Sequence, residues 1–215
     1  MIIKNSYTGY LSAFMAMLFI SSTVFAAKVK GDNEHARKWN KFADDVLVLH
    51  EALIKKIPVH KKTELGGYSG NPDFYKEERH YAKSHGKLIS IVQWERDNPE
   101  LLHTIEVYVR DDEGRILRDY SAAYLPQYRN APTQTLVSIH IHNGDLHAFR
   151  TFEATGDRIV ERCTGKLNGE EVNFILDEDE IAHAEGGFTD VMEQTDYKAC
   201  FKGMPEQAGK YLSPQ

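Results

Sequence analysis

Residues 101–124, LLHTIEVYVRDDEGRILRDYSAAY, decide the fold class, because apolar and polar side chains alternate on both sides of an acidic turn. With Asp112 and Glu113 at the tip of a hairpin, Ile105 lies opposite Tyr120 on an apolar face. Glu106 then lies opposite Asp119 on a polar face. This pattern predicts an antiparallel sheet that is covered on one side only.

Similar runs occupy most of the chain between the two ends. Alternation bounded by Gly, Asn, Asp and Ser turn signals predicts strands at 74–82, 87–96, 101–110, 115–124, 135–142, 145–153, 158–164 and 171–177. Short turns force neighbouring strands to be antiparallel, so we expect a curved meander of about eight strands. A closed eight-stranded up-and-down barrel is the alternative architecture.

A helical pattern precedes the strands. Asp32 and Asn33 offer capping side chains, and Pro58 ends the pattern. Apolar residues recur at steps of three or four at Ala36, Trp39, Phe42, Val46, Leu49, Leu53 and Ile57. The sequence therefore predicts an α+β fold, with an N-terminal amphipathic helix packed on the sheet and a glycine-rich linker at 66–72.

The first 26 residues have the pattern of a secretory signal peptide. Lys4 precedes an apolar core, and small residues stand before a cut at Ala27. Removal of residues 1–26 would leave one α+β domain, residues 27–215, with 189 residues and a charge of −7. An uncleaved N-terminal anchor is the other interpretation, and with cleavage no transmembrane span is expected.

The negative charge is concentrated in a C-terminal tail. From Gly165 onward there are eleven acids against four bases, whereas residues 27–164 hold twenty-one of each. We expect residues 177–187 to form a solvated acidic loop and the chain after Gly203 to be a loose terminus. Neither part has the basic surface of a nucleic-acid-binding protein, so that partner class is excluded.

Cys163 and Cys200 are the two cysteines of the chain. Export would place them in an oxidising compartment, where one disulfide that ties the tail to the sheet is the default expectation. Two thiols exclude a disulfide-dense miniprotein, and no Cys-x-x-Cys motif is present.

The turn in residues 138–147, SIHIHNGDLH, predicts a hairpin with the Asn-Gly pair at its tip. His142 then lies opposite Asp145 and His140 opposite His147, with all four side chains on one face. Such a set suits zinc, copper or nickel. The alternative is a polar sheet face without a metal.

Glu106 and Asp119 form a second candidate site. Two carboxylates at cross-strand distance repel each other, so one can retain its proton and act as an acid in hydrolysis. The alternative is a pair of solvated surface carboxylates.

These observations rank three hypotheses about the function of the protein. No phosphate-binding glycine loop, Gly-x-Ser-x-Gly elbow or His-Glu-x-x-His motif is present. The first hypothesis is a secreted, periplasmic, non-enzymatic binding or accessory protein of the cell envelope, whose partner is an envelope protein or a small apolar ligand. The alternative is a periplasmic transition-metal-binding protein that uses the histidine hairpin, and the third is a metal-dependent or acid–base hydrolase.

Overall fold

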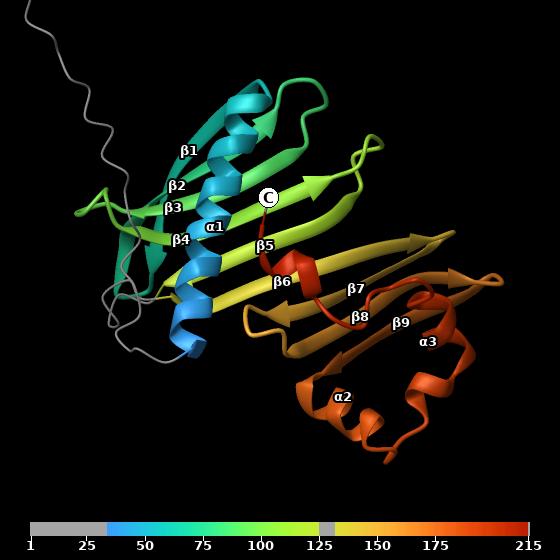
Figure 1. Ribbon diagram of the computed structural model, residues 1–215. Helices are drawn as coiled ribbons and strands as arrows, with labels where there is room; N and C mark the ends of the chain where they lie inside the picture. Colours follow the sequence, from blue (N-terminus) through green and yellow to red (C-terminus); the bar gives the residue numbers. More distant parts are fainter. Residues whose placement is uncertain (1–33, 125–131, 215) are drawn as a thin grey trace, which may run out of the picture.

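The computed structural model describes residues 34–124 and 132–214, which form one nine-stranded antiparallel sheet with helices (Figure 1). The strands follow one another in chain order across the sheet. They are β1 (Val59–Tyr68), β2 (Asn71–Ala82), β3 (Leu88–Glu95), β4 (Leu102–Arg110), β5 (Ile116–Tyr124), β6 (Pro132–Asn143), β7 (Leu146–Glu153), β8 (Arg158–Leu167) and β9 (Glu170–Asp177). The predicted α+β meander is confirmed, and all eight predicted strands are present.

The ninth strand, β1, lies at one edge of the sheet and includes part of the predicted linker. Its sequence shows no apolar alternation, because most of its residues are exposed, and the charged Lys61, Lys62 and Glu64 are of the kind that is usual in an edge strand. Close packing against β2 requires glycine at Gly66 and Gly67. An added Cβ on Gly67 would lie 2.0 Å from the Asn71 carbonyl oxygen, so only glycine allows β2 to approach this closely.

The N-terminal helix α1 (Glu34–Lys56) crosses one face of the sheet and packs on β3 to β6 (Figure 1). Phe42 and Val46, from the predicted stripe, are almost fully buried there. They belong to one continuous core with Val107, Tyr120 and other residues of the covered face. The predicted helix cap at residues 32 and 33 lies outside the described residues.

Residues 178–214, the C-terminal segment, cover the same face beside α1 (Figure 1). The segment contains α2 (Glu178–Glu185), η2 (Val191–Glu193), α3 (Thr195–Cys200) and η3 (Gly209–Leu212). The expected acidic loop is therefore wrong. Asp177 caps α2 in a capping box with Glu180, and acids in the first turn suit the helix dipole.

The expected loose terminus is also wrong. Met204 and Ala208 are buried in the core, so the chain after Gly203 folds back over the sheet. The apolar residues here are too widely spaced to show a periodic pattern.

The sheet is open, so the closed-barrel alternative is not adopted: β1 and β9 are its two edges and do not pair. Helix α1 and the C-terminal segment bury the apolar face that a barrel would close upon itself. The described residues place no helix on the opposite face, which we call the open face. No helix in the described part of the chain is long and apolar enough to cross a membrane. The predicted signal peptide lies outside that part.

The β4–β5 hairpin, formed by residues 101–124, has a different register from the one predicted. Val107, rather than Ile105, is the partner of Tyr120. Gly114, at φ +78°, makes a longer turn than the two-residue tip assumed, and a bulge at Val109/Arg110 adds a further residue to β5. From the pair Val109–Arg118 onward the shift is two residues, so these side chains keep their predicted faces. Next to the turn, Ile116 is opposite Arg110 instead of Val109.

Candidate functional site

The three histidines of the β6–β7 hairpin lie together on the open face, but their register is also shifted. The tip is Gly144–Asp145 with Gly144 at φ +62°, the position that a type II′ turn reserves for glycine. His142 is therefore opposite His147, and His140 is opposite Phe149. Asp145 is exposed in the turn and is not opposite His142, so that part of the prediction is wrong.

The imidazoles form a hydrogen-bonded and stacked row. His140 lies between two partners, with Nε2 2.6 Å from Asp119 Oδ2 and Nδ1 2.9 Å from His147 Nε2. The rings of His142 and His147 are nearly parallel, with centroids 4.6 Å apart. Burial, together with the adjacent His140 and His142, lowers the pKa of His147 to about 4, so this ring is neutral at pH 7.

The predicted pair of carboxylates is separated by a tyrosine. Glu106 is opposite Ser121, and Asp119 is opposite Tyr108, so the expected Glu106–Asp119 pairing is wrong. The Tyr108 hydroxyl donates a hydrogen bond to Glu106. Burial, Glu106 and Asp119 all raise the pKa of Tyr108 above its usual range, so the phenol keeps its proton.

The structure thus joins the two predicted sites into one polar cluster of Glu106, Tyr108, Asp119, His140, His142 and His147. In the described residues its imidazoles bond to Asp119, to each other and to the Ile116 carbonyl, and to no hydroxyl or thiol that would act as a nucleophile. Within that same part of the chain, no three His, Cys, Asp or Glu side chains are placed to hold a metal ion. Metal binding by this hairpin stays a prediction, which requires His140 to give up a present partner.

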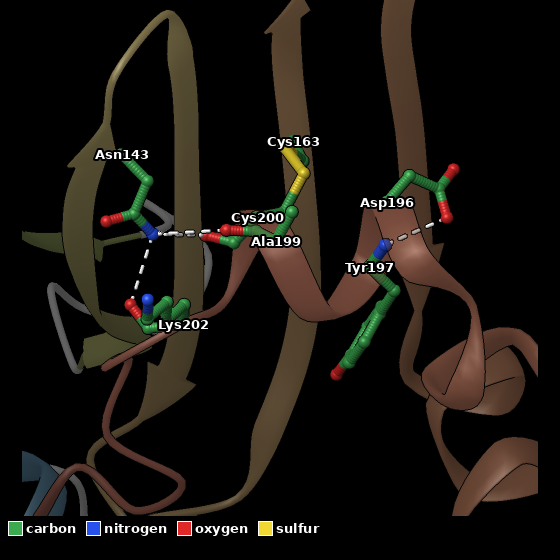
Figure 2. Close-up of a disulfide and its surroundings, with 7 residues drawn as sticks. All are labelled: Asn143, Cys163, Asp196, Tyr197, Ala199, Cys200 and Lys202. Carbon is green, nitrogen blue, oxygen red and sulfur yellow. Dashed lines mark hydrogen bonds between the residues drawn. A yellow bond between two sulfur atoms is a disulfide. The ribbon is translucent and has the colours of Figure 1, made fainter. Parts of the chain in front are cut away.

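A disulfide fastens the C-terminal segment to the sheet, as the sequence predicts. Cys163 of β8 is bonded to Cys200 of α3, and both are fully buried (Figure 2). Asn143, at the end of β6, reaches the same segment, with Nδ2 within 3.2 Å of the carbonyl oxygens of Ala199, Cys200 and Lys202. A disulfide of this kind fits an extracellular or periplasmic protein.

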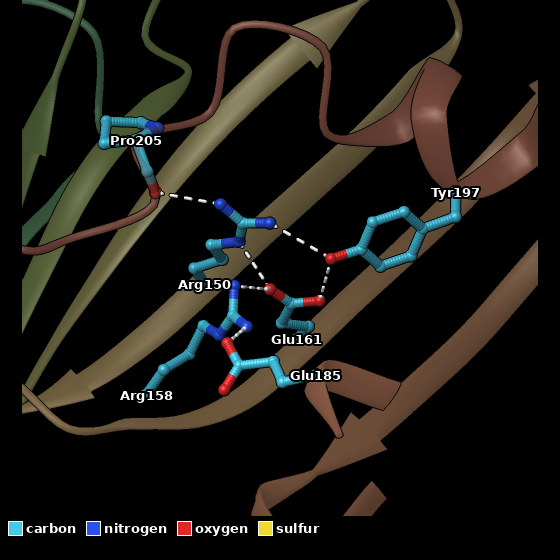
Figure 3. Close-up of polar contacts among 6 residues, drawn as sticks. All are labelled: Arg150, Arg158, Glu161, Glu185, Tyr197 and Pro205. Atoms are coloured by element: carbon cyan, nitrogen blue, oxygen red, sulfur yellow. Dashed lines mark hydrogen bonds and ion pairs between the residues drawn. The ribbon is translucent and has the colours of Figure 1, made fainter. Parts of the chain in front are cut away.

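A buried ionic network makes the second attachment (Figure 3). Glu161, which is 0% exposed, accepts hydrogen bonds from Arg150 and Tyr197 and forms an ion pair with Arg158. Arg150 also donates to the Pro205 carbonyl at 3.0 Å. The network therefore holds α3 and the chain that follows it against β7 and β8.

A cavity of about 700 Å³ adjoins this network. Both arginines that line it are paired, Arg150 with Glu161 and Arg158 with Glu161 and Glu185. This cavity offers no unpaired cation to a ligand.

Two smaller cavities adjoin each other where the C-terminal segment crosses β5 and β6. The first, about 460 Å³, is lined by Arg118, Tyr120, Lys210, Tyr211 and Ser213. The second, about 310 Å³, shares Arg118 and Tyr211 with the first, and its other wall residues include Leu117, Ile139, Ile141, Met204 and Pro205. We call the two together the cleft.

Sequence reasoning missed the cleft entirely. Its cationic residues come from β5 and from the region around η3, and no local motif connects them. The available signal was weak: Arg118 interrupts the apolar side of β5 between Ile116 and Tyr120.

Comparisons with known proteins identify no family. No protein-family model and no curated protein matches this chain. A solved structure of a DUF3836 family protein from Parabacteroides distasonis ATCC 8503 aligns with 61% of this chain and 97% of its own, at 7% sequence identity. The TM-score is 0.23, which is too low to support any argument about fold or function.

Proposed function

We propose that this protein is a non-enzymatic binding protein of the bacterial periplasm that holds a small molecule in the cleft. The observation that carries the proposal is the pair of adjoining cavities, about 460 and 310 Å³, that share Arg118 and Tyr211. Concave sites of this size, with apolar walls and a few polar groups, are the usual form of small-molecule sites.

The way in which the cleft is built supports this proposal. One wall is the rigid sheet, and the other is a segment that has little regular structure and is held by the disulfide and by Asn143. A site needs such fixed walls to bind without a large ordering cost. The predicted signal peptide and the disulfide support a location outside the cytoplasm.

The polar cluster on the open face supports metal binding and hydrolysis less well. Both ring nitrogens of His140 already have protein partners, and parallel stacked rings do not direct their lone pairs to one point. Elemental analysis of protein purified without chelator, beside a His140→Ala/His142→Ala variant, tests whether these histidines bind a metal. More metal in the wild type than in the variant would support the metal-binding alternative over our proposal.

The cleft is tested with N-phenyl-1-naphthylamine, a neutral apolar dye whose fluorescence rises on binding. Ser213 lines the cleft and is exposed, so Ser213→Trp fills its entrance. We expect the wild type to bind the dye and Ser213→Trp to bind it at least roughly tenfold more weakly.

The matched control is Ser84→Trp, at an exposed turn between β2 and β3. It adds the same apolar ring outside the cleft and should bind the dye as the wild type does. No dye binding by the wild type, or equal binding by Ser213→Trp, would contradict the proposed function.

A further inference from the structure

The cleft contains two cationic side chains close to one aromatic ring. The Arg118 guanidinium carbon lies 5.1 Å and the Lys210 ammonium nitrogen 5.2 Å from the centre of the Tyr211 ring. Neither cation forms an ion pair within the part of the chain that the structure describes. By contrast, Arg150 and Arg158 at the neighbouring cavity are both neutralised by carboxylates.

Among the described residues, none of those that line the two cavities carries a carboxylate. The chain as a whole has a net charge of −6, so a concave region with two unpaired cations and no acid differs from the rest of the molecule. Such a region attracts an anion.

Arg118 also has an unused donor. Its Nε is buried and has no hydrogen-bond partner among the described residues. Buried N–H groups are almost always paired, so this atom needs an acceptor that the described residues do not provide. A carboxylate has the geometry to accept two parallel bonds from a guanidinium, through Nε and one terminal nitrogen.

The second cavity has more apolar side chains in its wall than the first, although His140 and the shared Arg118 also line it. Ile139, Ile141 and Met204 line it, and it begins at the shared residues Arg118 and Tyr211. A ligand with its anionic group on Arg118 can therefore place an apolar body along these side chains, where burial of apolar surface stabilises it.

We propose that the ligand of the cleft is a carboxylate with an apolar body, bound through its anionic group by Arg118 and Lys210. This inference rests on the proposed function and adds the chemical class of the ligand. The apolar body is either an aliphatic chain or an aromatic ring, and the probes octanoate and 2-naphthoate distinguish these two.

The experiment measures displacement of N-phenyl-1-naphthylamine from the full chain by octanoate, 2-naphthoate, 1-octanol and inorganic phosphate. We expect at least one of the two carboxylates to displace the dye at a concentration roughly tenfold or more below that of 1-octanol, because a hydrogen bond to a charged group is involved. Phosphate, which has charge but no apolar body, should compete poorly.

Two variants locate the charge preference. In Arg118→Gln/Lys210→Gln the neutral dye should still bind. The carboxylate and 1-octanol should then displace it at about the same concentration. Arg118→Lys, which keeps the charge but loses the planar fork, should lie between the two and serves if the double variant does not fold. The control is Arg115→Gln, because Arg115 is paired with Asp111 and Glu113 outside the cleft.

The outcomes separate the two proposals. If the dye does not bind, the proposed function itself fails. If the dye binds but both carboxylates are no better than 1-octanol, or phosphate competes as well as they do, only the ligand class is wrong. An undiminished carboxylate preference in Arg118→Gln/Lys210→Gln would likewise overturn the assignment to these two residues.

Discussion

At the scale of single residues, buried imidazoles are the groups most sensitive to their surroundings. His50 of α1 and His80 of β2 lie on either side of Ser90, whose hydroxyl is 2.9 Å from His50 Nδ1 and 3.3 Å from His80 Nδ1. Burial and the adjacent His80 lower the pKa of His50 to about 4. The helix therefore packs on the sheet through a histidine that must remain neutral.

This histidine makes stability depend on pH. The folded pKa of His50 is about 4 and the ordinary value is 6.5, so between these values the unfolded chain binds more protons than the folded one. The free energy of unfolding should fall as the pH drops from 6.5 to 4, by up to about 3 kcal/mol from this group. Above pH 6.5 the group adds no pH dependence.

His50→Gln should remove much of this slope while keeping a hydrogen bond to Ser90. Urea unfolding at several pH values between 7 and 4 measures the difference. His60→Gln, an exposed position on β1, is the control and should keep the wild-type slope. An equal slope in wild type and His50→Gln would contradict the assignment; a residual slope is expected from His147, whose pKa is also about 4.

At the scale of elements, the sequence pattern predicts faces better than partners. The strands of both misjudged hairpins are displaced by two residues, which preserves the face of most side chains; Ile116, beside the bulge, and Asp145, in the turn, are exceptions. The Asn-Gly signal assumes that the two residues form the tip, as Asn168 and Gly169 do with φ values of 54° and 90°. At Asn143 the amide is held by carbonyls of the C-terminal segment, so that residue stays in the strand and the turn moves to Gly144.

The disulfide joins β8 to α3, and its removal should lower the free energy of unfolding. Cys163 and Cys200 are separated by 37 residues, and opening a loop of this length should lower the free energy of unfolding by about 3–4 kcal/mol. Urea unfolding of Cys163→Ser/Cys200→Ser, beside reduced wild type, measures this loss. The reduced wild type should behave like the variant, and a change below about 1 kcal/mol in both would be inconsistent with a stabilising bridge.

At the scale of the whole molecule, two separate pieces cover one face of an open sheet. Helix α1 covers the middle strands, and the C-terminal segment covers β7 to β9 and reaches back to β5 (Figure 1). The attachment of the C-terminal segment to the sheet depends on Glu161. Its carboxylate binds Tyr197 of α3 and the two strand arginines, which in turn bind Glu185 of α2 and the Pro205 carbonyl.

Removal of that carboxylate should destabilise the whole molecule. Glu161→Ala would leave Arg150 and Arg158 largely buried without their shared partner, at a cost of about 3–5 kcal/mol in the free energy of unfolding. Glu185→Gln changes an exposed partner of the same Arg158 and should cost less than about 1 kcal/mol. Equal effects of the two variants in thermal or urea unfolding would show that the buried network does not hold the segment.

The sequence by itself determined the elements and faces whose signals are local or covalent. The apolar stripe of α1, the alternation of eight strands and the pairing of Cys163 with Cys200 are all readable, because periodicity and cysteine number constrain them directly. The exposed edge strand β1 has no such periodicity, and the register of the hairpins depends on bulges and on contacts with a distant segment.

Only the tertiary structure decided where ligand chemistry can occur. It joined the predicted histidines and carboxylates into one cluster, because Asp119 and His140 lie on neighbouring strands. It also created the cleft, because the C-terminal segment folds back and places Lys210 and Tyr211 beside Arg118. Residues so far apart in the chain share no local pattern, so the close approach of these side chains depends on the packing of the whole molecule.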